Sequence, residues 1–319
     1  MTNEISNHFN GKKYINPTLK EQFSPKFSDF RKMRKVKRGE WYKRELEVLD
    51  VSFDNALKQN ELAITFIGHA TFLIQMYGVN ILTDPVWSKR ASPLSWIGPK
   101  RYTEAGIYVE NLPHIDLILL SHNHYDHLDK KTLKKLNKKF SPKVLVPMGD
   151  KKLVKSLGFK NVQEMDWWDS VSFDKNTQII FTPQQHSSAR GLFDRDKSLW
   201  GSFYLRQGER SVYFGGDGGY SAHFAEIKNR LSSPEIALIG IGAYKPNFFM
   251  KPIHTSPEEA VLAHQDLGAK QSVAMHFGTF RLSAEAIFEP IKDLEKSIKK
   301  YGLKAHDFII MSEGEKRFF

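Results

Sequence analysis

Residues 121–129 read Ser-His-Asn-His-Tyr-Asp-His-Leu-Asp, which places three imidazoles and two carboxylates directly after the apolar run 115–120. Such ligands suit Zn²⁺, Mn²⁺ or Fe, and the chain has no cysteine to offer a softer one. In an extended segment His122 and His124 would point to the same side, because side chains repeat every two residues. Asp126 and His127 are adjacent, so they need a turn and suit a second metal ion beside the first. The spacing therefore predicts a metal site rather than a His-rich surface turn.

The composition predicts a globular protein without a membrane span. With 319 residues, 40% of them hydrophobic, the chain can bury a substantial core as one large domain or two. It contains no apolar run of 18 residues, and residues 1–10 lack the apolar segment of a signal peptide. The absence of cysteine excludes a disulfide scaffold. We expect a cytoplasmic protein, with peripheral membrane contact as an option.

The chain is basic, with 47 Lys and Arg against 36 Asp and Glu. Much of this charge lies in residues 31–44 and 130–143. Such blocks attract nucleic acid or anionic lipid headgroups, but each also fits a solvated lysine face. No aromatic stacking array is interleaved with the basic runs, which argues against nucleic acid as a partner. An anionic membrane surface is the partner we expect.

Strand and helix signals alternate after an N-terminal extension, residues 1–60, that we expect to pack on the main body, residues 61–319. Tyr77-Gly78 divides two β-rich runs as a hairpin turn would. Asp129 is a candidate cap for a helix over 130–140, and Ser256 with Glu259 forms a capping box for a helix that stops at Gly268. Further strands are predicted at 116–121, 143–147, 178–182, 202–206, 211–214, 236–241, 271–276 and 307–312. This order indicates α/β layers, with two mixed β-sheets face to face and helices outside, an αββα sandwich.

Three more candidate ligands each follow a predicted strand: His186, Asp217 and His276. Any one of them alone fits a capping or core role. Ligand sites in open α/β sheets lie beyond the carboxyl ends of strands, so together with the 121–129 stretch they can converge on one crevice. Glycines on either side of Asp217 would let the backbone crowd around a bridging carboxylate.

This ligand order resembles that of the metallo-β-lactamase superfamily, and several segments resemble one of its families more closely. Asp84-Pro85-Val86-Trp87 and Gly98-Pro99-Lys100-Arg101 are similar to segments of the N-acyl-phosphatidylethanolamine-hydrolysing phospholipase D family. So are Leu199-Trp200-Gly201-Ser202, Ile241-Gly242-Ala243-Tyr244 and His276-Phe277-Gly278-Thr279-Phe280. The resemblance covers residues 9–319. One departure follows His186, where Ser187-Ser188-Ala189-Arg190-Gly191 replaces a Trp-Cys-Lys-Arg-like run, and it leaves the exact lipid open.

The resemblance implies the metallo-β-lactamase fold and a di-zinc phosphodiesterase. One Zn²⁺ would take His122, His124 and His186, and the other would take Asp126, His127 and His276. Asp217 would bridge the ions, with a hydroxide between them that attacks phosphorus. Asp126 would orient this hydroxide or accept its proton, and His254 would meet the substrate phosphate. The products would be phosphatidate and an N-acylethanolamine.

The sequence leaves other functions open. The metals could serve a different substrate, such as a soluble phosphodiester, a lactone or RNA, and the same ligands accept Mn²⁺, Fe²⁺ or Co²⁺. A lipid-binding protein with a vestigial site is a further alternative, although all seven ligands are present. A homodimer is expected from the resemblance only.

Overall fold

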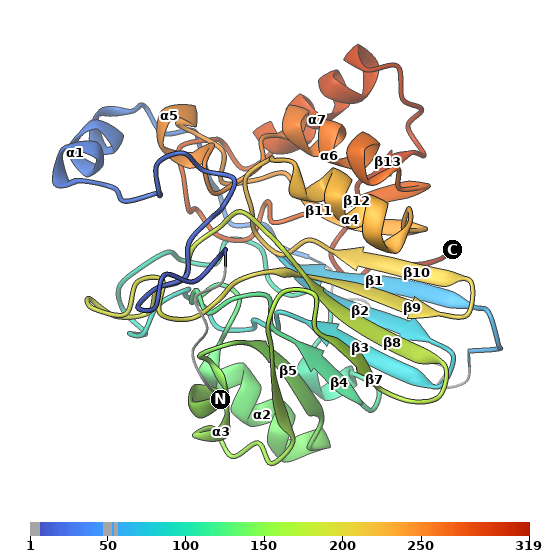
Figure 1. Ribbon diagram of the computed structural model, residues 1–319. Helices are drawn as coiled ribbons and strands as arrows, with labels where there is room; N and C mark the ends of the chain where they lie inside the picture. Colours follow the sequence, from blue (N-terminus) through green and yellow to red (C-terminus); the bar gives the residue numbers. More distant parts are fainter. Residues whose placement is uncertain (1–6, 47–52, 54–56) are drawn as a thin grey trace.

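The computed structural model describes residues 7–46, 53 and 57–319. Two seven-stranded β-sheets pack face to face, with helices on both outer faces of the sandwich (Figure 1). The predicted αββα arrangement of two mixed sheets is confirmed.

The first sheet has the order β14-β1-β2-β3-β4-β5-β6. Its strands run antiparallel from β14 to β3 and parallel from β3 to β6. The bounds are β1 Leu62–Gly68, β2 Thr71–Met76, β3 Val79–Thr83, β4 Leu117–Leu119, β5 Lys143–Pro147, β6 Val162–Met165 and β14 Lys316–Phe318.

The second sheet has the order β13-β12-β11-β10-β9-β8-β7 and repeats this pattern. Its strands run antiparallel from β7 to β10 and parallel from β10 to β13. The bounds are β7 Ser170–Ser172, β8 Thr177–Thr182, β9 Ser202–Gln207, β10 Arg210–Phe214, β11 Ile236–Gly240, β12 Gln271–Met275 and β13 Phe308–Ile309. The strand predicted at 307–312 is thus shorter than expected, because a turn in which Ser312 N–H bonds Glu315 follows it.

The main core lies between the sheets. Phe66 and Phe72 of the first sheet and Phe181 and Phe203 of the second are fully buried, and the rings of each pair lie 4.9 Å apart. Every residue of β1 and β2 is buried. Strands covered on both faces read as continuous apolar runs, as Leu62–Gly68 does. Packing against two layers therefore fixes these strands near the site.

The helices cover the outer faces of the two sheets. α2 begins at its predicted cap, Asp129, which accepts a hydrogen bond from Lys131 N, and it buries Leu133 and Leu136 against the first sheet. α6 has the predicted capping box and ends at Gly268 in the left-handed conformation. The bounds are α1 Phe27–Lys35, α2 Lys130–Phe140, α3 Lys151–Lys155, α4 His223–Leu231, α5 Asn247–Met250, α6 Pro257–Leu267 and α7 Glu289–Lys300, with a 3-10 turn at Val109–Asn111. None of the described helices has the length and apolarity needed to cross a bilayer.

The described part of the N-terminal segment runs along the main body. Phe23 packs edge-on against Phe249, with ring centroids 5.4 Å apart, and Trp41 donates a hydrogen bond to the Glu285 carbonyl. Phe27 and Phe30 are two further aromatic residues from which the sequence predicts anchoring of this segment, and their side chains lie outside the described part of the chain. The segment thus contacts the second half of the chain over a long path.

Candidate dinuclear metal site

The predicted site residues come together at the carboxyl ends of four strands. The 121–129 stretch follows β4, His186 follows β8, Asp217 follows β10 and His276 follows β12. His124 and His254 are partly buried, whereas the other predicted ligands are buried. The site therefore opens to solvent beside these two histidines.

His122, His124 and His186 form the first cluster. His124 Nδ1 lies 2.9 Å from His122 Nε2 and 3.2 Å from His186 Nε2. Burial lowers the pKa of all three rings, that of His124 to about 4, so they are neutral at pH 7. A tetrahedral ion with metal–nitrogen bonds of about 2.0–2.1 Å holds its ligands about 3.3 Å apart. Three neutral nitrogens at this spacing suit such an ion.

Hydrogen bonds on the far side of the rings fix which nitrogen faces the site. His186 Nδ1 donates to the Ile253 carbonyl at 2.7 Å, which leaves the Nε2 lone pair for the cluster. Ser121 Oγ donates to Asp84 at 2.5 Å and lies 2.9 Å from His122 Nδ1, whose N–H it can accept. Metal-binding histidines commonly have such a partner on the second nitrogen.

The second cluster contains Asp126, His127 and His276, with His69 beside them. Asp126 Oδ2 lies 3.1 Å from His69 Nε2, 3.4 Å from His276 Nε2 and 3.6 Å from His127 Nε2. His127 Nδ1 donates to Asp84 at 2.6 Å, so its Nε2 faces the cluster. The distances bring all three predicted ligands of the second ion together.

Asp217 lies between the clusters. Its Oδ2 is 3.0 Å from His276 Nε2, 3.1 Å from His127 Nε2 and 3.9 Å from His186 Nε2. Its Oδ1 is buried without a hydrogen-bond partner among the described residues. One oxygen of this carboxylate, Oδ2, lies near both histidine sets, and the other, Oδ1, is unsatisfied. This is the position expected of a bridging ligand.

Charge in the site favours a cation. Burial alone would lower the pKa of His127 and His276, but the nearby Asp217 and Asp126 raise both, that of His276 to about 9. Burial alone would raise the pKa of Asp126 and Asp217, but His127 and His276 hold the pKa of both carboxyl groups well below the usual range. Protons on the histidines thus balance the carboxylates, and a divalent cation would balance them as well.

Unsatisfied atoms test whether a metal fits here. Among the described residues, Nδ1 of His276 and Nδ1 of His69 are buried without a hydrogen bond, in addition to Asp217 Oδ1. Buried polar atoms normally have partners, and a bound ion would supply partners for the unpartnered atoms of this cluster. Together with the nitrogen and oxygen donor set, they show that these residues fit a divalent metal ion.

His254 lies at the open side of the site. Its Nδ1 is 3.8 Å from Asp217 Oδ2, and its ring centroid is 5.2 Å from that of His186 and 5.3 Å from that of His276. Burial lowers the pKa of His254 to about 4. A neutral histidine here can present an N–H or a lone pair to an incoming ligand.

The backbone around the site is strained or crowded. His69, Asp84 and His276 have backbone φ angles of 60°, 31° and 60°, which residues other than glycine rarely adopt. Gly216 also has a positive φ, and a Cβ there would lie 2.6 Å from Ser121 Cβ. Such strain is typical of functional sites, and the close approach is the one expected from the glycines around Asp217.

Two supporting residues were not predicted. Asp150 accepts hydrogen bonds from Asn123 and Ser198, both at 2.9 Å, and so holds the loop between His122 and His124. It follows β5, so the strand-end signal that found the ligands could have found it. Asn16 gives no such signal, because its partner lies 170 residues away in the chain.

Asn16 is expected to position His186. Its side chain donates to the His186 carbonyl at 2.8 Å and accepts from the His186 N–H at 3.1 Å. Removing one support of a metal ligand commonly weakens metal binding by about 10-fold to 100-fold. The Asn16→Ala variant should show this loss in a zinc titration. Asn10→Ala, in an exposed turn, should bind zinc normally, and equal affinity of the two variants would contradict the prediction.

Comparison with known proteins identifies the superfamily and the family of the chain. Residues 79–277 match the model of the β-lactamase superfamily domain. The chain is 37% identical to N-acyl-phosphatidylethanolamine-hydrolyzing phospholipase D 1 of Caenorhabditis elegans over 85% of this chain and 79% of that protein. It is also 37% identical to the mitochondrial enzyme of that name from Saccharomyces cerevisiae, over 82% of this chain but only 58% of the yeast protein. The structure of Igni18, a metallo hydrolase from Ignicoccus hospitalis, superposes with a TM-score of 0.61 at 23% identity and covers 82% of this chain and 99% of Igni18.

The fold and site therefore define a member of the metallo-β-lactamase superfamily, a metal-dependent hydrolase with the metallo-β-lactamase fold. Within this superfamily the chain belongs to the family of the N-acyl-phosphatidylethanolamine-hydrolysing phospholipases D.

Proposed function

We propose that the protein is a di-zinc phosphodiesterase that hydrolyses N-acyl-phosphatidylethanolamine or a related phospholipid to phosphatidate and an N-acylethanolamine. The position of Asp217 carries the proposal, since one carboxylate contacts two sets of histidines in a chain 37% identical to two such phospholipases. His122, His124 and His186 would hold one ion, and Asp126, His127 and His276 the other.

When bound, two divalent ions supply positive charge against the transition state of a phosphodiester and make water acidic enough to react near neutral pH. The protein residues do the rest. Asp126 stays ionised at pH 7 and can orient the attacking water or accept its proton. His254, neutral at the open side, can donate a hydrogen bond to a phosphate oxygen. His69 holds Asp126 in place through their 3.1 Å contact.

A lipid assay tests the proposal. Purified protein loaded with zinc should release N-acylethanolamine from N-acyl-phosphatidylethanolamine in detergent micelles, and a chelator should abolish release until zinc is restored. The His254→Ala variant should keep its zinc and lose activity by about 100-fold, as groups that contact the charge of the transition state often do. The matched control is His264→Ala. His264 is a buried histidine that lies outside the site and hydrogen-bonds with Ser272.

The same preparation separates the alternatives. A soluble phosphodiester, a lactone and RNA are offered at equal zinc content, and preference for any of them over the phospholipid would replace the lipid proposal. Fewer than about one zinc ion per chain, with no hydrolysis of any substrate, would favour the vestigial lipid-binding protein.

A further inference from the structure

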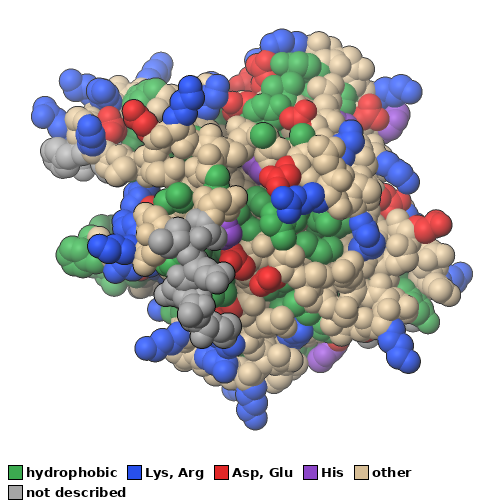
Figure 2. Space-filling view, in the orientation of Figure 1, with side chains coloured by type: hydrophobic (Ala, Val, Ile, Leu, Met, Phe, Trp, Pro, Cys, Tyr) green, Lys and Arg blue, Asp and Glu red, His purple; other side chains and the backbone are tan. Residues whose placement is uncertain are grey.

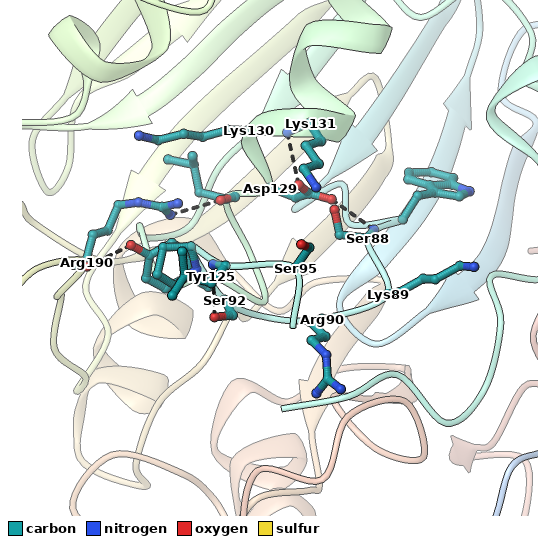
Figure 3. A pocket seen from close by; sticks show the side chains of 14 residues that line it. Ser88, Lys89, Arg90, Ser92, Ser95, Tyr125, Asp129, Lys130, Lys131 and Arg190 are labelled. Atoms are coloured by element: carbon teal, nitrogen blue, oxygen red, sulfur yellow. Dashed lines mark hydrogen bonds between the residues drawn. The ribbon is translucent and has the colours of Figure 1, made fainter. Parts of the chain in front are cut away.

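A cavity of about 510 Å³ lies beside the metal site, against residues 121–129. Tyr125, Leu128 and Asp129 line it from the motif, and Arg190 lines it from the loop after His186. Four more cations, which we call the rim cations, surround it: Lys89, Arg90, Lys130 and Lys131. In Figure 3, Lys131 points into the hollow between Asp129 and Ser95, while the other rim cations project outward around the edge.

The cations that line this cavity outnumber its carboxylates. None of the rim cations forms an ion pair within the described part of the chain. The Arg90 side chain donates a hydrogen bond to the Gly98 carbonyl, which is uncharged. Asp129, the one carboxylate in the lining, is already engaged by Ser88 N, Lys131 N and Thr132 Oγ1. The positive N-terminal end of α2 adds to the field. The cavity therefore attracts anions.

Large apolar side chains stand exposed on the two loops beside the cavity. Trp96 is 71% exposed, Leu192 91% and Phe193 85%, and Leu94 and Ile97 are about half exposed. These five are half of the ten large hydrophobic residues exposed in the described part of the chain. At the left edge of Figure 2, hydrophobic and basic side chains gather side by side, and Figure 1 shows the loop near residue 190 projecting there.

We propose that the rim cations and these five apolar side chains form a docking surface for an anionic phospholipid bilayer. The cavity takes a phosphate-bearing headgroup, and the apolar side chains enter the layer beneath the headgroups. Cations around a hollow beside exposed aromatic and aliphatic side chains suit a charged interface over an apolar interior. The choice of a lipid occupant rests on the proposed function. Of the two basic blocks in the sequence, the surface includes Lys130 and Lys131 of residues 130–143 and none of residues 31–44.

Vesicle binding tests this surface without any hydrolysis. Zinc-loaded protein is sedimented with phosphatidylcholine vesicles, with or without about one third phosphatidate. We expect binding only to the anionic vesicles. Each basic side chain near an anionic surface contributes about fivefold in affinity. Loss of the three positive charges alone gives about 100-fold, so reversing Lys89, Lys130 and Lys131 to Glu should weaken binding by at least about 100-fold. Trp96→Ser with Phe193→Ser should also weaken it, because apolar area leaves the bilayer.

Matched controls make the result specific. Lys270, Lys299 and Lys304 are exposed lysines without ion pairs in the region of α6 and α7, and reversing them changes the net charge equally. That variant should bind the anionic vesicles within about threefold of the unmodified protein. Equal losses in the two triple variants, or binding that ignores phosphatidate, would overturn the proposal. Loss of vesicle binding in millimolar inorganic phosphate at constant ionic strength would instead identify a free-phosphate site. Because these vesicles contain no N-acyl-phosphatidylethanolamine, absence of lipid hydrolysis would leave this test unchanged.

Discussion

The Asp217→Asn variant is expected to lose at least about 1,000-fold in hydrolysis and to retain about one zinc ion or fewer per chain. The substitution preserves shape but removes the negative charge within 3.1 Å of both His127 and His276. Metal charge contributes several kcal/mol to a phosphodiester transition state, and each 1.4 kcal/mol is tenfold in rate. Elemental analysis and the lipid assay measure the two effects.

A carboxylate outside the site serves as the control for this variant. Asp266 on α6 accepts a hydrogen bond from Tyr220, and Asp266→Asn can keep that bond while removing a charge. It should hold two zinc ions and near-normal activity. Thermal unfolding checks that both variants fold. If Asp217→Asn, correctly folded, stayed within tenfold of the unmodified activity, Asp217 would not be the bridge.

Metal affinity is expected to fall about 100-fold for each unit of pH lost between pH 8 and pH 6. In the metal-free protein, the charges of Asp217 and Asp126 outweigh burial and raise the pKa of His127 and His276, the latter to about 9. Both rings therefore carry a proton in this range, and an ion must expel both. By mass action each expelled proton weakens binding tenfold per unit of falling pH. Competition with a chromophoric chelator at pH 6, 7 and 8 measures the slope.

The His276→Gln variant sharpens this measurement. It removes one of the two protons, so the slope should fall to about tenfold per pH unit even though the absolute affinity is lower. An affinity that is constant from pH 6 to pH 8 in the unmodified protein would contradict the proton competition.

The residues that gather at the candidate site could be predicted because their signals are local. Residues 121–129 are dense in ligands, and His186, Asp217 and His276 each follow an apolar strand that reads clearly in the sequence. The helix caps at Asp129 and Ser256 are equally local and are confirmed. The two layers followed from the alternation of strands and helices.

What escaped prediction depends on distant parts of the chain. β14 is a short edge strand, Lys316–Phe318, whose charged residues give no apolar pattern, and only its pairing with β1 defines it. The hydrogen bonds of Asn16 to His186 join residues 170 positions apart in the sequence. The repeated topology of the two sheets leaves no visible sequence repeat, because packing constrains apolar character rather than residue identity.

The two sheets each contribute to both metal clusters. His122, His124, Asp126 and His127 come from the first half of the chain, whereas His186, Asp217 and His276 come from the second. Neither half alone supplies all the ligands of an ion, so bound ions would link the two halves of the chain. Metal would then bind only after the two halves have docked correctly, and an incompletely assembled chain would have no complete metal site.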